Sequence, residues 1–313
     1  MIRKFKEVLE KIKSRPKKQL AVAVAQDITV LYAVKKAAEQ DIADYILVGN
    51  QQEIIEIADD SGIKINKDKI YDEPNNLKAI EKAVQLVTSN RADILMKGCV
   101  HTDDFLRGVL NLGWGLRTGQ IMSHINVLES EALDRLLFIT DGEMNIAPDL
   151  DTKTGIILNA IYLAELFDIK DPKVAVTTAV ELANPNMPST TDAAVLAKMS
   201  QRGPFSGKTI AGPFALDNTI NPWAAQHKGI NGPVAGDADI IVVPNIEAGN
   251  MLSKAHVYLA GGNLAGVLVG ASAPVVLTSR TDTPQSKLYS IATAVMMADL
   301  QRNLSIKLGK VHY

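Results

Sequence analysis

The sequence has one cysteine, almost no net charge and no long apolar run, and each shortage excludes a class of protein. Cys99 is the only cysteine in 313 residues, so no disulfide can form within the chain. A formal net charge of -2 provides no general basic field for a nucleic acid or an anionic membrane. Apolar runs such as residues 20–25 and 239–244 are far shorter than the ~20 residues that span a bilayer. The first twenty residues carry charges throughout, without the apolar core of an export signal. We therefore expect a cytoplasmic protein with no nucleic-acid or membrane partner.

The common signatures of metal, nucleotide and serine-hydrolase sites are also missing. The five histidines include no HxxxH pair and one cysteine cannot supply a thiolate cluster, so we expect no metal. Residues 203–209 (GPFSGKT) have three residues between their glycines, where a phosphate-binding loop needs four. Residues 113–119 (GWGLRTG) have one residue too many for a dinucleotide fingerprint, and no GxSxG elbow occurs. Any anion must therefore be bound by other residues.

Short apolar runs rich in β-branched residues alternate with longer segments of helical periodicity. We expect strands near residues 20–25, 45–48, 93–96, 136–140, 173–177, 239–243 and 275–278. The expected helices include residues 29–39, 52–60, 77–88, 152–167 and 284–300. This alternation indicates parallel βαβ units in a layered α/β fold. A chain of this length is expected to form two domains, and the absence of a Pro/Gly/Ser-rich linker favours two domains that share a continuous interface.

Polar and basic residues follow the expected strand near residues 93–96. Lys97 ends the strand, and Thr102 is the expected N-cap of the next helix, whose free N–H groups favour an oxyanion. Arg107, further along that helix, can reach a phosphate in bidentate fashion. The alternative is an exposed arginine on a solvated helix face, and spacing alone does not decide between the two.

Two further loops place amides after strands. Asn145 lies in the loop that follows residues 136–140, and Asn250 lies where a helix begins after residues 239–243. In an α/β sheet the carboxyl ends of the strands are where ligands bind, so both are candidate substrate-binding residues. Turn chemistry and helix capping are the alternative interpretation.

The segment after the expected strand at 275–278 is the strongest candidate site. Ser279 and Arg280 follow the strand directly, and Asp282 precedes a helix that starts with a proline. A hydroxyl and a guanidinium that project together from a strand end form a compact site for an oxyanion.

Four blocks of the sequence, in order along the chain, resemble the phosphate acetyl/butyryltransferase family. They are HTDDFLRGVL, ITDGEMNIAPDL, PNIEAGNML and LTSRTDTPQSKLYSIA. The last block is more similar to the butyryltransferase branch than to the acetyltransferase branch. The resemblance covers nearly the whole chain.

The resemblance implies a two-domain α/β fold of the isocitrate/isopropylmalate dehydrogenase type, with a cleft between the domains. Residues 1–130 and 280–313 would form the first domain, and residues 131–279 the second, through which a homodimer would form. The implied reaction converts acyl-CoA and inorganic phosphate into acyl phosphate and coenzyme A, with butyryl as the expected acyl group. Coenzyme A is then a substrate, and no separate cofactor is expected.

By resemblance, Ser279 and Arg280 correspond to a catalytic serine and arginine, and Arg107 to a substrate-binding arginine. The acetyltransferase branch has an aspartate base seven residues after the serine, but this chain has Ser286 there. Asp282 is therefore our candidate general base. Three alternatives remain open: a phosphate acetyltransferase, an NAD- and metal-dependent decarboxylating dehydrogenase of the same fold, and a non-catalytic protein that binds coenzyme A or phosphate.

Overall fold

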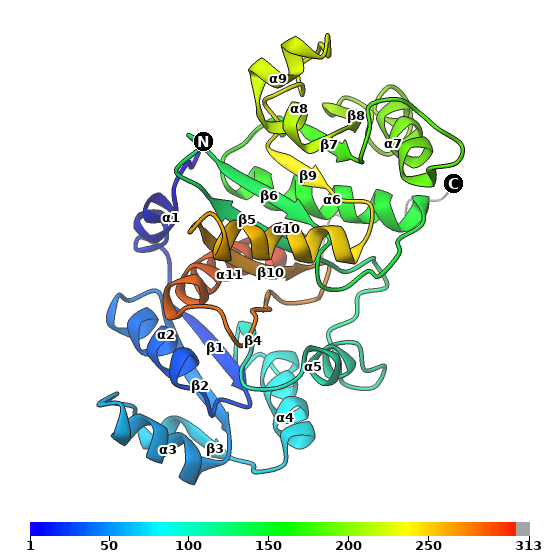
Figure 1. Cartoon of the computed structure of the whole chain (residues 1–313). Coiled ribbons are helices and arrows are strands. Elements are labelled where there is room, and N and C mark those ends of the chain that lie inside the picture. The colour runs from blue at the N-terminus through cyan, green and yellow to red at the C-terminus, as the bar shows by residue number, and fades with distance from the viewer. Residues whose placement is uncertain (305–313) are drawn as a thin grey trace. The chain divides into compact units, whose positions relative to one another are not determined.

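The computed structural model describes the backbone of residues 1–304 and the side chains of residues 1–298 (Figure 1). The chain divides into two compact units. The terminal unit consists of Phe5–Gln120 and the chain from Ala265 onward, and the middle unit consists of Met1–Lys4 and Ile121–Leu264. Residues 1–4, 121–130 and 265–279 therefore belong to the other unit from the one that the sequence predicted. Residues 305–313, which the prediction assigned to the first domain, lie outside the described residues.

The sheet of the terminal unit is parallel except at one edge. Its strands are β1 (Lys18–Ala23), β2 (Ala43–Gly49), β3 (Ile70–Asp72), β4 (Ile94–Lys97), β10 (Asn263–Val269) and β11 (Val275–Val276). They are ordered β3-β2-β1-β4-β11-β10, and only β10 runs antiparallel to its neighbour β11. The four residues of β4 are all buried, as expected for a central parallel strand that is covered on both faces.

Helices cover both faces of this sheet. They are α1 (Phe5–Ile12), α2 (Ile28–Glu39), α3 (Gln51–Asp60), α4 (Asn76–Thr88), α5 (Thr102–Val109) and α11 (Pro284–Leu304), with a 3-10 turn at Lys67–Lys69. The crossovers that contain α2 and α4 run in opposite directions along the sheet, and right-handed crossovers then place these helices on opposite faces. Helix α11 packs against α1 and α2, and the Phe5 ring stacks on Tyr289 with a centroid distance of 4.3 Å.

The strands of the middle unit run in both directions. They are β5 (Ser123–Glu129), β6 (Leu136–Thr140), β7 (Val174–Thr177), β8 (Ile210–Phe214) and β9 (Ile240–Val242), in the order β5-β6-β9-β7-β8. Strand β5 is antiparallel to β6, and the other pairs are parallel. Its helices are α6 (Leu150–Leu166), α7 (Pro188–Met199), α8 (Leu216–Ile220), α9 (Pro222–His227) and α10 (Ile246–Tyr258).

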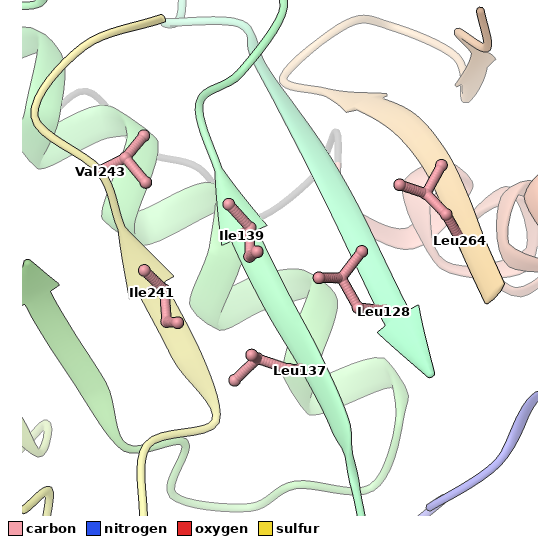
Figure 2. Close-up of a cluster of buried hydrophobic side chains, with 6 residues drawn as sticks. All are labelled: Leu128, Leu137, Ile139, Ile241, Val243 and Leu264. Atoms are coloured by element: carbon pink, nitrogen blue, oxygen red, sulfur yellow. The ribbon is translucent and has the colours of Figure 1, made fainter. Parts of the chain in front are cut away.

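One core cluster of the middle unit lies on neighbouring strands of the sheet (Figure 2), and residues of α10 pack against it. Its buried members come from neighbouring strands: Leu128, Leu137, Ile139, Ile241, Val243 and Leu264. Ala248, Leu252 and Val257 of α10 pack against them. Burying each large aliphatic side chain stabilises the fold by about 1.5–3 kcal/mol. The cluster therefore fixes the start of α10 beside the end of β6, where Asn250 and Asn145 lie.

Several sequence predictions can now be compared with the structure. The predicted α/β class is confirmed. Strands β3, β5, β8 and β10 were not among the expected strands, and β11 is only two residues long. No helix among residues 1–304 has both the length and the hydropathy to cross a membrane. Within the described residues, no group of three or more His, Cys, Asp or Glu side chains is placed to hold a metal ion.

Candidate active site

The carboxyl ends of three neighbouring parallel strands meet at one edge of the terminal unit. Strand β4 lies between β1 and β11, so the segments that follow these strands are adjacent. The backbone N–H groups of Gly98 and Cys99 donate to Ala23 O at 2.9 Å and Val24 O at 2.7 Å, which extends the pairing of β4 with β1. This is the edge at which open α/β sheets bind ligands.

Gly98 allows the loop after β4 to approach β1 this closely. A Cβ atom at Gly98 would lie 2.1 Å from the carbonyl oxygen of Val24, and a backbone oxygen cannot move aside as a flexible side chain can. On the other side of β4, the Lys97 ammonium donates to Thr278 O at 3.3 Å. Lys97 is only 2% exposed, so the structure places this predicted substrate-binding residue within the interior, where it connects β4 to the end of β11.

The predicted Ser279–Arg280–Asp282 segment forms a closed turn after β11. Asp282 Oδ2 accepts a hydrogen bond from Ser279 N at 2.8 Å, and Asp282 N donates to Ser279 O at 3.2 Å. The Ser279 hydroxyl is half-buried and lies 3.1 Å from Thr281 Oγ1. Arg280 is exposed and forms no ion pair with any side chain of the described residues. The turn therefore presents a hydroxyl beside a guanidinium that is available to an anion.

A second lysine lies beneath this turn. Lys287, in the first turn of α11, is 1% exposed, and its ammonium donates to Ser279 O at 2.8 Å and Asp282 O at 2.9 Å. Burial lowers the pKa of Lys287 below its ordinary value, and electrostatic interactions with Asp282, Asp27 and Cys99 oppose this effect. These three groups follow β11, β1 and β4 respectively, so Lys287 lies where the three strand ends converge.

At this edge, Thr278 Oγ1 and Gln26 Oε1 are buried without a hydrogen-bond partner among the described residues. Thr278 is 5% exposed, and its Oγ1 has no hydrogen-bond partner among the described residues. Buried hydroxyl groups are nearly always hydrogen-bonded, so this atom is a natural contact for a water molecule or a ligand. It directly precedes Ser279.

Helix α5 corrects one prediction and leaves another open. Thr102 was expected to be the N-cap, but it is the first helical residue, and His101 occupies the capping position without a side-chain cap hydrogen bond. The prediction was wrong by one residue because a threonine followed by acidic residues is typical of both positions. The Arg107 side chain is 79% exposed and pairs with Asp104 at 3.3 Å. Such exposed pairs contribute at most about 1 kcal/mol, so the pair does not prevent Arg107 from binding an anion.

The predicted amides lie in the middle unit: Asn145 in the loop that follows β6, and Asn250 near the start of α10. Asp141, 2% exposed, accepts from Glu143 N and Met144 N, both at 3.0 Å. The Asn145 amide donates to Asp141 Oδ2 at 2.6 Å and Met122 O at 2.9 Å. The Asn250 amide donates to Glu143 Oε1 at 2.9 Å. These NH₂ groups therefore brace the loop, and the side-chain oxygens of the two asparagines remain as the groups that a substrate could contact.

Sequence reasoning missed two residues of these sites. Lys287 looks like any lysine on a solvated helix face, and nothing in its spacing shows that it is buried. Asp141 did have a signal, because an aspartate followed by glycine after a strand is typical of a turn in which the carboxylate accepts backbone N–H groups.

The geometry defines a class of protein: an α/β protein that gathers a hydroxyl, an exposed arginine and two buried lysines at the carboxyl edge of a parallel sheet. Such a set binds an anion and stabilises negative charge that develops on an oxygen.

Comparisons with known proteins identify the family. The family model described as "Phosphate acetyl/butaryl transferase" matches residues 4–85 and 72–295. A phosphate butyryltransferase from Clostridium acetobutylicum is 51% identical over 298 residues, which cover 95% of this chain and 99% of the relative. A phosphate acetyltransferase from Thermotoga maritima is 41% identical over 94% of this chain and 100% of the relative. The chain belongs to the phosphate acetyl/butyryltransferase family, and the predicted phosphate acyltransferase activity is confirmed.

Solved structures agree with this assignment. A branched-chain phosphotransacylase from Enterococcus faecalis V583 superposes with a TM-score of 0.78 at 31% identity, covering 90% of this chain and 99% of that one. A 4-hydroxythreonine-4-phosphate dehydrogenase from Klebsiella pneumoniae superposes with a TM-score of 0.51 at 14% identity, covering 90% of this chain and 100% of that one. The second likeness shows a common fold alone.

Proposed function

We propose that this chain transfers a butyryl group between coenzyme A and inorganic phosphate, and that the turn Ser279–Asp282 carries the reaction. The observation that carries the proposal is the exposed guanidinium of Arg280 next to the Ser279 hydroxyl in sequence, on a turn closed by Asp282. The choice of butyryl rests on the 51% identity to a relative that is named a phosphate butyryltransferase.

In this mechanism Arg280 and Arg107 hold phosphate, which arrives already ionised. A phosphate oxygen attacks the thioester carbonyl carbon and forms the new C–O bond, which gives a tetrahedral oxyanion. The C–S bond then breaks, and the sulfur leaves with the bonding electron pair as the thiolate of coenzyme A. The Ser279 hydroxyl donates a hydrogen bond to the oxyanion or to the departing sulfur. Positioning and electrostatic stabilisation supply the rate enhancement.

The reverse reaction requires a base, because the thiol of coenzyme A must lose its proton. Ser286 is a poor base: it is 4% exposed, and its hydroxyl lies 3.1 Å from Thr283 Oγ1. Asp282 is half-buried and accepts from Ser279 N through Oδ2, which leaves Oδ1 to accept a proton. We therefore assign the base to Asp282.

The remaining predicted residues have supporting roles in this proposal. Lys97 and Thr102 shape the phosphate side of the strand-end site. Asn145 and Asn250 contact coenzyme A through their side-chain oxygens. Coenzyme A acts as a substrate without a separate cofactor. The proposal also includes a cytoplasmic location and a homo-oligomer that associates through the middle unit. Both rest on the resemblance to the family.

The test is the phosphate-dependent release of free thiol from acetyl-, butyryl- and longer acyl-CoA, with a chelator present and without nicotinamide cofactor. Release that requires phosphate and has its highest kcat/KM with butyryl-CoA would support the proposal. A preference for acetyl-CoA would show that the transferred acyl group is acetyl. Acetyl is the second candidate because the chain is 41% identical to a phosphate acetyltransferase. Absence of turnover with every acyl-CoA would contradict the proposed function.

A further inference from the structure

Lys287 has a contact pattern that the proposed mechanism does not use. Its ammonium donates to the carbonyl oxygens of Ser279 at 2.8 Å and Asp282 at 2.9 Å, which are the first and last residues of the turn. Asp282 closes the same turn from the opposite direction, since its carboxylate accepts from Ser279 N. A buried cation and a half-buried carboxylate together fix a turn of four residues.

Burying the Lys287 ammonium costs free energy, because the charged group loses its contact with water. Lys287 is 1% exposed and belongs to the interior face of α11, where an aliphatic side chain would cost far less to desolvate. The groups that interact electrostatically with it each follow one of the three converging strands: Asp282 after β11, Asp27 after β1 and Cys99 after β4. The lysine thus connects the helix to the candidate site through its hydrogen bonds to Ser279 O and Asp282 O.

The two carbonyl oxygens that accept from Lys287 also affect how favourably the turn can bind an anion. Carbonyl oxygens carry partial negative charge, and two of them beside a phosphate would repel it. A lysine ammonium bonded to both offsets that charge and prevents the turn from reversing their direction. The backbone conformation that sets the positions of Ser279 and Arg280 is thereby held.

We propose that Lys287 is a positioning residue for acyl transfer, which holds the turn Ser279–Asp282 in the conformation that directs Ser279 and Arg280 at the same ligand. This inference rests on the proposed function. Lys287 acts through these two residues, because its hydrogen bonds go to backbone carbonyls.

The test compares Lys287→Met, which keeps the length of the side chain and removes its donors, with Lys36→Met. Lys36 is exposed and donates to Gln285 Oε1 at 3.0 Å, so the control removes a lysine hydrogen bond to the same helix without touching the turn. In thiol-release assays with butyryl-CoA and phosphate, Lys287→Met should lower kcat by about 10- to 100-fold, the range expected when reacting groups are misplaced. Lys36→Met should stay within about twofold of the unmodified protein, as expected for a surface contact.

A double-mutant cycle separates positioning from general stability. If Lys287 acts through Ser279, then Lys287→Met in a Ser279→Ala background should lower kcat by less than about threefold, because coupled residues are not additive. Lys287→Arg, which keeps a charge and donors, should recover part of kcat. The same loss of kcat in both backgrounds, or a loss that tracks only the fraction of folded protein, would overturn the proposal.

Hydrogen exchange gives a result that does not depend on turnover. Lys287→Met, or Lys287→Gln should the methionine variant fail to fold, should accelerate amide exchange in residues 279–283 while Lys36→Met leaves it unchanged. Unchanged exchange in that segment would overturn the inference even in an active enzyme. An unmodified protein that lacks phosphate-dependent thiol release but shows the exchange effect would contradict the proposed function and leave the turn-holding role of Lys287 supported.

Discussion

Two strand-end loops of this molecule are closed by the same chemistry and leave different groups for a ligand. The turn Ser279–Asp282 of the terminal unit is closed by Asp282, which accepts Ser279 N. The loop after β6 in the middle unit is closed by Asp141, which accepts Glu143 N and Met144 N. In the first, an exposed arginine and a half-buried serine remain available. In the second, the side-chain amide donors are already used within the loop. An aspartate that accepts backbone N–H groups therefore occurs in both loops and does not identify the reactive one. The reactive turn is distinguished by the side chains that remain available to a ligand.

We expect the greatest loss of unfolding free energy from substitutions at Gly98 and Gly142, the glycines at which backbone segments approach each other closely. Gly98→Ala would place a Cβ 2.1 Å from Val24 O, whereas Gly142→Ala would place one 2.9 Å from the Gly249 carbonyl carbon. We expect Gly98→Ala to cost on the order of 4 kcal/mol of unfolding free energy, and Gly142→Ala to cost less. Chemical denaturation measures both. A suitable control is Gly113→Ala, whose Cβ would come no closer than 3.5 Å to Asn111 Oδ1. Equal stability of all three variants would contradict the close approach of β1 and β4.

Substitution of the two aspartates should lower the unfolding free energy of the protein by different amounts. Asp141 is 2% exposed and accepts several N–H groups, so Asp141→Ala should cost about 2–4 kcal/mol of unfolding free energy, because buried donors lose their acceptor. Asp282 is half-buried and accepts one backbone N–H, so Asp282→Ala should cost about 0.5–1.5 kcal/mol. Urea unfolding of both variants tests this order. If Asp282→Ala were the less stable variant, the contrast between the loops would be lost.

The catalytic side of the comparison is tested by Asp282→Asn. An asparagine keeps an oxygen that can accept Ser279 N but cannot serve as a base at neutral pH. The rate of acyl-CoA formation from butyryl phosphate and coenzyme A should fall by about 100-fold, as expected for loss of a general base. The phosphate-dependent direction should fall less, because phosphate is already ionised. An undiminished rate of acyl-CoA formation would eliminate Asp282 as the base.

Lys287 provides the smallest expected effect and a test by pH. Burial lowers its pKa, so between that lowered pKa and the ordinary lysine value of about 10.4 the unfolded chain binds more protons than the folded one. Stability should therefore rise with pH across this window, by at most about 1.4 kcal/mol per pH unit. Relative to Lys287→Met, the unmodified protein should gain unfolding free energy as the pH rises. A difference between the two proteins that is constant with pH would show that Lys287 is not desolvated in solution.

The sequence predicted the fold class better than the details of individual elements, and it proposed the turn after β11 as the active site. Strands such as β4 can be recognised from their apolar sequence, because parallel strands are buried on both faces. Strand β5 was missed because its buried residues include Ser123, His124 and Asn126, which interrupt the apolar pattern. Ser279 and Arg280 were recognised because a hydroxyl and a guanidinium directly follow a strand. Lys287 was not, because burial of a helical lysine depends on which elements pack against it, and no local pattern carries that information.

The boundaries between the units were harder to place for a related reason. The terminal unit ends its first part at Gln120 and resumes at Ala265, within β10. No Pro/Gly/Ser-rich linker marks either position: Gln120 lies in an exposed loop before β5, and Ala265 lies within a buried strand. Unit boundaries of this kind follow from three-dimensional contacts, which the linear pattern does not contain.

Arg280, on the turn after β11, is expected to bind the reacting phosphate, and its role can be measured through the phosphate dependence of the reaction. The rate of thiol release from butyryl-CoA is titrated with phosphate for the unmodified protein, for Arg280→Ala and for Arg202→Ala, an exposed arginine of the middle unit. We expect Arg280→Ala to lower kcat/KM for phosphate by about 100- to 1000-fold, as for loss of one key charge-stabilising group, and Arg202→Ala to leave it unchanged. Equal phosphate dependence in the two variants would contradict the account.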